Sequence, residues 1–322
     1  MKPKFPSLKQ VRAWFTEHTK ALEGEHQVSA GEPLTWPLSE DRTLTQPLPQ
    51  RGVTPAPPFV PLAPGQMQVG IGYSVGLQRE HNEDALFALT TNLHSNGSDL
   101  LFGLFVVADG MGGHQHGEVA SETALRALTQ RLIQEAYVPL VGTAMPEETS
   151  LTETLRAAVY DAHQAVQHNA PGGGTTLTVA LILNEQMAVA HVGDSRAYAL
   201  YPAGRMDILT RDHSLVKRLQ ELGQLTAEQA AVHPQRNVLY RALGQAEPLD
   251  ADIFVTAVPR NGYLVLCSDG LWGMVPDEKI YQVVMEAASP AEAAQTLVDE
   301  ANAAGGVDNI SVIVVRFPAA EE

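Results

Sequence analysis

Two patterns of apolar residues alternate along the chain from residue 66 onward, and each predicts a different kind of element. Short apolar runs predict β-strands, because their length suits a buried or half-buried strand. These runs are Gln68–Val75, Leu101–Ala108, Leu177–Leu183, Met187–Val192, Ala197–Tyr201, Asp252–Val258, Tyr263–Cys267 and Ser311–Arg316. The pattern therefore predicts a domain with many short strands.

Longer stretches have the period of amphipathic helices. Ala120, Ala124, Ala127, Leu128 and Leu132 share one face, and Leu151, Leu155, Ala158, Val159 and Ala162 share another. A third helix is predicted from its ends, with Ser289 as N-cap, Pro290 in the first turn, Glu292 three residues after the serine, and Gly305-Gly306 as the stop. Because strands and helices do not alternate regularly, the order predicts an α+β fold rather than a doubly wound parallel sheet.

The first 65 residues have a different composition. Residues 7–24 place Leu8, Val11, Phe15 and Leu22 at near-helical spacing, and the stretch 32–65 is crowded with proline, as in an extended linker. A lone short helix is marginal in water, so a flexible or loosely packed tail and a docking element both remain open. We therefore predict an N-terminal segment (1–31), a linker (32–65), a folded domain (66–318) and a C-terminal tail (319–322).

Composition and charge narrow the classes of function. Of the 322 residues, 44% are hydrophobic, which is enough for a substantial core and excludes wholesale disorder. The net charge of −16 would repel phosphate backbones and anionic lipid, which argues against nucleic acid and membrane surfaces as partners. The single Cys267 rules out a disulfide framework. No apolar stretch approaches the ~20 residues of a membrane span. We expect a cytoplasmic monomer.

The most informative feature is the position of certain carboxylates. Three apolar runs end in an aspartate at a glycine-containing turn, and two acidic sites stand just before a strand. The acidic residues concerned are Asp109, Asp194, Asp269, Glu83, Asp84 and Asp308. One aspartate-glycine pair after a strand is usually turn chemistry. Because strand ends and starts meet at one edge of an antiparallel sheet, repetition at five places predicts convergence on one site.

Converging carboxylates need a counter-charge. A pair ~5 Å apart costs roughly 3 kcal/mol at an effective dielectric of ~20, so protons or cations must neutralise the cluster. Oxygen ligands without cysteine favour Mg²⁺ or Mn²⁺ over zinc. Two such ions can hold a hydroxide and clamp a phosphoryl group for in-line attack. Gly110, Gly112 and Gly113 would let the backbone approach an ion or anion closely.

Seven motifs in order complete the picture: GLQREHNEDA, VVADGMGGH, GGTTLTVAL, AHVGDSRAY, LTRDHS, LVLCSDGLW and VDNISVIVV. With them the sequence resembles the metal-dependent serine/threonine protein phosphatase family (protein phosphatase 2C type) in its bacterial form, over about residues 67–317. The resemblance implies a central β-sandwich of two mostly antiparallel sheets, flanked by antiparallel helix pairs. It also implies a flap near the cleft at about residues 212–248.

The resemblance also implies a set of metal ligands, namely Glu83, Asp84, Asp109, Gly110 through its carbonyl, Asp194, Asp269 and Asp308. Asp109 would bridge two Mn²⁺ or Mg²⁺ ions. Asp269 and Asp308 would complete the shell of the first ion, and Glu83 and Asp84 would hold the second, one of them through water. Asp194 would contribute to a third, weaker site.

Catalytic and substrate contacts follow from the same resemblance. Besides Asp109, Arg79 would grip the substrate phosphate bidentately, and His114 would be the general acid that protonates the leaving serine or threonine oxygen. In the flap, Arg236 and Arg241 have two open interpretations, as substrate contacts or as solvated surface arginines.

Other conspicuous residues have plain structural interpretations. Cys267 is expected to be a buried, inert thiol, and His191 a core histidine. His163 and His168 are expected on a solvent-exposed helix face, and Trp272 to serve packing alone.

The expected function is hydrolysis of phosphoserine and phosphothreonine in proteins by a metal-bridged hydroxide, without a covalent phospho-enzyme. Partners would be phosphorylated proteins, among them a serine/threonine kinase or its targets. One alternative is a catalytically silent family member acting as a binding module, although every expected acid is present. Another is a dinuclear-metal phosphodiesterase or nuclease, against which the acidic surface counts.

Overall fold

A computed structural model of the chain describes residues 66–95, 98–112, 115–141, 150–245 and 248–318. The predicted helix at 7–24, the linker at 32–65, the tail at 319–322 and His114 lie outside the described residues.

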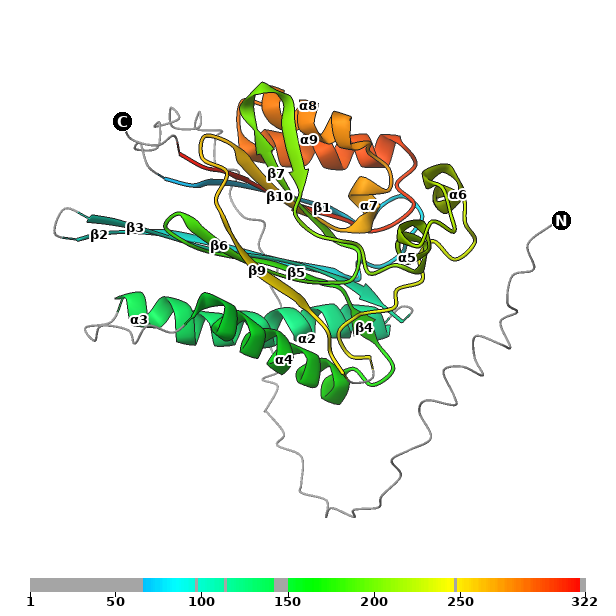
Figure 1. Cartoon of the computed structure of the whole chain (residues 1–322), viewed down its shortest axis with the longest axis horizontal. Helices are drawn as coiled ribbons and strands as arrows, with labels where there is room; N and C mark the ends of the chain where they lie inside the picture. Colours follow the sequence, from blue (N-terminus) through cyan, green and yellow to red (C-terminus); the bar gives the residue numbers. More distant parts are fainter. Residues whose placement is uncertain (1–65, 96–97, 113–114, 142–149, 246–247, 319–322) are drawn as a thin grey trace, which may run out of the picture. The chain divides into compact units, whose positions relative to one another are not determined.

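Two antiparallel sheets form the centre of the domain (Figure 1). The first has the order β1 (Gln68–Ser74), β11 (Ile310–Arg316), β10 (Tyr263–Cys267), β7 (Arg196–Tyr201) and β8 (Arg205–Ile208). The second has the order β2 (Asp84–Ser95), β3 (Ser98–Met111), β5 (Leu177–Leu183), β6 (Gln186–Val192) and β9 (Asp252–Ala257), and β4 (Gly174–Thr175) pairs with β3. Among the described residues, all neighbouring strands in both sheets are paired antiparallel.

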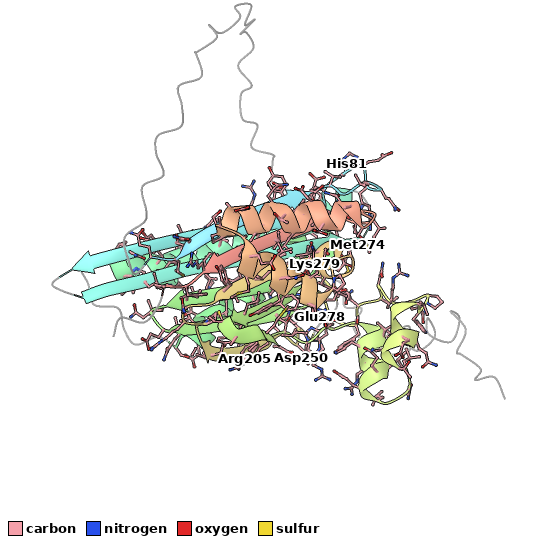
Figure 2. The ribbon with its side chains drawn as sticks, turned by 90° about the horizontal axis from the view of Figure 1, so that it is seen from above. His81, Arg205, Asp250, Met274, Glu278 and Lys279 are labelled. Atoms are coloured by element: carbon pink, nitrogen blue, oxygen red, sulfur yellow. The ribbon has the colours of Figure 1, made fainter. Side chains whose placement is uncertain are left out.

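Helices cover the outer face of each sheet (Figure 1). Helices α2 (Gln115–Leu132) and α4 (Leu151–Asn169) lie against the second sheet, and a π-helical segment η1 (Ile133–Tyr137) and α3 (Val138–Val141) continue α2. Helices α8 (Asp277–Glu286) and α9 (Pro290–Ala303) lie over the first sheet. Seen from above (Figure 2), Lys279 stands on α8, and its Nζ lies 3.0 Å from Glu300 Oε1 on α9. The predicted α+β fold with two antiparallel sheets is confirmed.

Three layers of apolar side chains account for this stacking. One core layer lies between the sheets and includes Phe105, Leu266 and Ile313, all fully buried. The other two lie between each sheet and its helices. Gly70 on β1 allows the close approach of α9, because a Cβ atom there would stand 1.9 Å from the carbonyl oxygen of Pro290. No described helix is long and apolar enough to cross a lipid bilayer.

The expectation for His163 is wrong, whereas that for His168 holds. His163 is 1% exposed, and its Nδ1 accepts a hydrogen bond from the amide of Gly244 (3.2 Å). The end of the flap segment covers this part of α4, so a position on the rim of the helix's apolar face becomes buried. Its neighbour one turn later, His168, is exposed as expected. Cys267 and His191 are fully buried, as predicted.

Candidate active site

A cavity of about 170 Å³ lies at one edge of the sandwich, where strands of both sheets end. Most of the residues singled out from the sequence line it: Arg79, Glu83, Asp109, Gly110, Asp194, Asp269 and Asp308. Asp84 is not among the lining residues. The structure therefore brings together acids that are up to 225 positions apart, Glu83 and Asp308.

Strand pairing explains how these acids meet. Asp84 opens β2 and is paired directly with Asp109 near the end of β3. Asp194 follows β6, and Asp269 begins the short helix α7 (Asp269–Trp272) directly after β10. Asp308 stands just before β11, the neighbour of β10. Each carboxylate thus sits where the chain leaves or enters a sheet at the same edge.

The backbone around Asp109 is held by two threonines. The amide of Asp109 donates to the Thr176 hydroxyl (2.9 Å), and the amide of Thr176 donates to the Asp109 carbonyl (2.8 Å). The Thr175 hydroxyl donates to the same carbonyl (2.9 Å). The Thr176 hydroxyl also bonds to the Ser195 hydroxyl (2.7 Å), next to Asp194 in the chain. Asp109 and Asp194 are therefore linked through a short hydrogen-bonded path.

Asn309 fixes the loop that carries Arg79 and Glu83. Its Oδ1 accepts from the amide of Glu83 (2.8 Å), and its Nδ2 donates to the carbonyls of Val75 (2.8 Å) and His81 (2.9 Å). Sequence reasoning missed this residue, although it follows Asp308 directly. Glu83 is itself buried, and a Cβ atom at Gly117 would stand 2.1 Å from its Oε2.

Asp84 lies behind the cavity. Its Oδ2 accepts from the Ser268 hydroxyl (2.8 Å), whereas its buried Oδ1 has no hydrogen-bond partner in the part of the chain that the structure describes. Burial, together with the charges of Asp269 and Asp308, raises the pKa of Asp84 to about 7. A buried carboxylate oxygen without a partner is costly, so this one calls for a proton, a water or a cation.

The other carboxylates have raised pKa values for the same reason. Burial, followed by the charges of neighbouring acids, raises the pKa of Asp109 and of Asp194 well above the usual value. Burial and the charge of Asp308 raise the pKa of Asp269 to about 6. Ionising all of them at neutral pH is therefore unfavourable unless a positive charge enters the cavity.

The donor set fits hard divalent cations, which prefer oxygen ligands and a negative site. Among the described residues, no three histidine, cysteine or acidic side chains already surround one point as a finished metal site would. The carboxylates line one cavity instead, and Asp308 is paired with Arg79, whose Nη2 lies 2.7 Å from its Oδ2. Arg79 is 46% exposed, and this pairing raises its pKa.

Trp272 has a polar role that the sequence did not reveal. Its Nε1 donates to the carbonyl of Asp194 (2.9 Å). The guanidinium of Arg196 lies over its ring, 3.7 Å from the centroid, and forms two hydrogen bonds to Asp212 (3.0 and 2.7 Å). The indole is thus held in place and in turn holds the backbone of Asp194.

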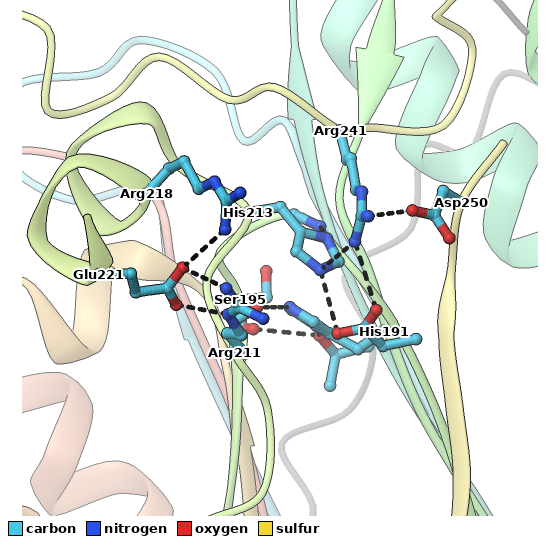
Figure 3. Close-up of polar contacts among 11 residues, drawn as sticks. His191, Ser195, Arg211, His213, Arg218, Glu221, Arg241 and Asp250 are labelled. Atoms are coloured by element: carbon cyan, nitrogen blue, oxygen red, sulfur yellow. Dashed lines mark hydrogen bonds and ion pairs between the residues drawn. The ribbon is translucent and has the colours of Figure 1, made fainter. Parts of the chain in front are cut away.

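The segment predicted as a flap contains two short helices, α5 (Leu215–Glu221) and α6 (Ala227–Ala231). Figure 3 shows the polar contacts at its base, where Glu221 pairs with both Arg211 and Arg218. Arg241 pairs with Asp250 and Asp252 and does not line the cavity. Arg241, one of the two flap arginines considered as substrate contacts, is therefore paired with acids at the base of the flap and does not face this cavity.

Two buried histidines tie the start of the flap to the second sheet (Figure 3). His213 Nδ1 accepts from the amide of Gly193 (3.2 Å), and its Nε2 lies 3.2 Å from both Asp252 Oδ2 and Arg241 Nη1. His191 Nδ1 lies 3.0 Å from the Thr178 hydroxyl, and its Nε2 lies 3.1 Å from the carbonyl of Arg211. Burial lowers the pKa of His191 to about 4, so this ring is neutral at physiological pH.

Comparisons with known proteins bear on the whole domain. A sequence model of the family described as protein phosphatase 2C matches residues 72–310. The chain is similar to the serine/threonine phosphatase stp of Listeria welshimeri, with 36% identity over 249 residues, which cover 75% of this chain and 92% of that protein.

Solved structures agree with this match. The chain is similar to the serine/threonine phosphatase PstP/Ppp of Mycobacterium tuberculosis, with 31% identity, a TM-score of 0.66, and coverage of 79% of this chain and 99% of that chain. It is also similar to the catalytic domain of serine threonine protein phosphatase PstP in complex with two manganese ions, with 30% identity, a TM-score of 0.64, and coverage of 78% and 98% of the two chains.

Proposed function

Because the chain belongs to the protein phosphatase 2C family, we propose that it hydrolyses phosphoserine and phosphothreonine in proteins with Mn²⁺ or Mg²⁺ held by the carboxylates of this cavity. As a member of the family it is a protein serine/threonine phosphatase. The proposal rests on one observation, the convergence of five acidic side chains on one cavity beside Arg79.

The carboxylates supply the charge that divalent ions need. Asp109 would contact both of two ions, and the Gly110 carbonyl would add a backbone oxygen. Asp269 and Asp308 would complete the first ion's ligands, with Glu83 and Asp84 for the second and Asp194 for a third, weaker site. Such a pair of ions supplies a nucleophilic hydroxide at neutral pH and neutralises the oxygens of the phosphoryl group.

Protons and divalent cations compete to neutralise the acids of this cavity. Without cations the cavity holds its acids only partly ionised, as the raised pKa values of Asp109, Asp194 and Asp269 show. With cations, the same burial strengthens the attraction between carboxylate and ion, because the local dielectric is low. The site is thus adapted to take up positive charge rather than to act as an acid.

Arg79 would bind and orient the substrate phosphate. A guanidinium has five N–H donors, and one of them is engaged by Asp308 in this structure. The remaining donors can form the bidentate contact that a phosphate group favours. Its loop is fixed by Asn309, so the position of Arg79 relative to Asp308 is set by the fold.

Protonation of the leaving serine or threonine oxygen is assigned to His114, which stays a prediction from the sequence. Substrates are then phosphorylated proteins, and we expect a serine/threonine kinase or its targets among the partners. A catalytically silent binding module is not favoured, since none of the expected acids is replaced.

The decisive test uses the purified full chain and a phosphothreonine peptide. We expect phosphate release with Mn²⁺ and its loss on addition of a chelator. Asp109→Asn should abolish turnover, whereas Asp299→Asn, a change of the same type on the exposed face of α9, should retain it. Circular dichroism checks that both variants fold. Undiminished activity in chelator, or in Asp109→Asn, would refute the proposal.

A further inference from the structure

A second cavity, of about 390 Å³, adjoins the first one. The two cavities share four lining residues, which are Asp194, Asn237, Asp269 and Asp308. The second cavity extends from these residues between the flap helices and α7. A substrate peptide whose phosphate lies in the first cavity could therefore extend directly into the second.

The walls of the second cavity combine apolar residues with polar and charged ones. Val216 of α5 and Ala230 of α6 line it on the flap side. Trp272, Met274 and Val307 line it on the side of the first sheet. Trp272 is immobilised by its hydrogen bond to Asp194 and by Arg196 over its ring. A fixed indole with aliphatic neighbours offers a contact surface to an extended peptide without a large loss of side-chain entropy.

Two cations of the flap that line this cavity have no acidic partner among the described residues. Lys217 is half-buried and Arg236 is exposed, and within the described ranges neither forms an ion pair. Their neighbours in the flap differ, since Arg211 and Arg218 share Glu221. Unpaired cations beside a binding cavity are notable in a chain of net charge −16.

The acids that also line this cavity do not cancel these cations. Both carboxylate oxygens of Asp212 accept hydrogen bonds from Arg196. Asp194, Asp269 and Asp308 belong to the shared end, where the proposed ions would neutralise them. The cavity next to the phosphate site is therefore lined by two cations that no acid of the described residues pairs with.

We propose that this cavity binds the peptide flanking the phosphorylated residue and that Lys217 and Arg236 select substrates with an anionic side chain in that flanking segment. The inference rests on the proposed phosphatase function and adds a substrate class to it. The anionic group is a carboxylate or a second phosphate, because both bind ammonium and guanidinium groups. The apolar residues of the walls would contact the backbone and apolar side chains of the flanking peptide.

The size of the preference follows from the exposure of the two cations. Each exposed ion pair contributes only about 0.2–1 kcal/mol. With two such pairs, we expect kcat/KM and affinity to be about two- to thirtyfold higher for an anionic peptide than for a neutral one. The preference should decrease as salt is added, because charges at the surface are screened.

The test compares phosphothreonine peptides that differ only in one flanking residue. A single glutamate is moved through the three positions on either side of the phosphothreonine, and glutamine at the same positions gives the neutral partner. A further peptide carries a phosphoserine at the preferred position, with mass spectrometry identifying which phosphate is lost first. Binding of the corresponding non-hydrolysable phosphonate peptides, measured by fluorescence anisotropy, reports on affinity apart from turnover.

We expect kcat/KM and affinity to favour glutamate over glutamine at one or more positions in the wild type. The ratio should fall towards one in the double variant Lys217→Gln/Arg236→Gln. It should persist in Arg156→Gln, which removes an exposed cation from α4, outside both cavities. A larger ratio for the phosphoserine peptide would identify a second phosphate as the preferred group, a smaller one a carboxylate, and an equal one a site that accepts both.

Two results would overturn the inference. One is an equal rate and affinity for glutamate and glutamine peptides at every position in the wild type. The other is an unchanged ratio in the double variant. Either result leaves the phosphatase function intact, since phosphate is still released. Failure to release phosphate from any peptide with Mn²⁺ would instead count against the proposed function itself.

Discussion

Replacing Asp269 by asparagine should stabilise the ion-free protein while removing its activity. In the native state the pKa of Asp269 is raised from 3.8 to about 6, by burial and then by the charge of Asp308. The difference of about two pKa units corresponds to about 3 kcal/mol that ionised Asp269 costs the native state. Asparagine has nearly the same shape and no charge, and its side-chain oxygen can still accept a hydrogen bond from Asp109.

The pH dependence has a definite sign. A carboxyl whose pKa is higher in the native state than in the unfolded state favours folding only while it is protonated. Between about pH 4 and about pH 6 the native protein therefore binds more protons than the unfolded chain, and the free energy of unfolding falls as pH rises. Above about pH 6 this contribution is fully lost. The wild type and the asparagine variant should thus be close in stability at pH 4 and diverge towards pH 7.

Thermal and urea unfolding with chelator check this expectation. At pH 7.5 we expect Asp269→Asn to exceed the wild type by about 1–3 kcal/mol, or about 2–12 °C in Tm for a domain of this size. The control Asp299→Asn, on an exposed position of α9, should change stability by less than about 0.5 kcal/mol. With Mn²⁺ the wild type should gain stability and the variant much less. A variant that is less stable than the wild type in chelator at pH 7.5 would refute the argument from repulsion.

Three further substitutions probe neighbouring contacts. Arg79→Ala should raise KM for a phosphopeptide by about ten- to a hundredfold, because charged hydrogen bonds contribute about 1.5–3 kcal/mol; an unchanged KM would count against its role. Trp272→Phe keeps a ring beside Arg196 but removes the hydrogen bond to Asp194, so kcat should fall several-fold with little change in Tm. Thr176→Val leaves the Asp109 amide without its acceptor, so it should lower kcat, and it should lower the free energy of unfolding by about 1–3 kcal/mol. Thr176→Ser should restore both quantities.

The strands and long helices could be predicted from the sequence because their apolar residues have a clear period. Runs such as Leu177–Leu183 are strands with the predicted bounds, and α9 begins at Pro290 after the predicted N-cap. Helix α8 was missed, because its buried residues, Ile280, Val283 and Val284, span little more than one turn. Short elements of this kind are stabilised by packing against their neighbours more than by their own sequence.

The acidic site could be predicted because each acid adjoins an apolar run, so the antiparallel topology itself brings these positions together. The contacts that hold the acids could not. Asn309, Thr176 and Trp272 act through hydrogen bonds between segments far apart in the chain, and no local pattern marks such a bond. The burial of His163 was mistaken for the same reason, since it depends on a segment about 80 positions later.

The central claim is that these carboxylates hold a pair of hard divalent ions. Anomalous diffraction from crystals of the full chain grown with Mn²⁺ tests it most directly. We expect two peaks about 3.5–4 Å apart, both in contact with Asp109 and one also with Asp269 and Asp308. Manganese peaks confined to other parts of the molecule, or a well-ordered cavity without any, would contradict the claim.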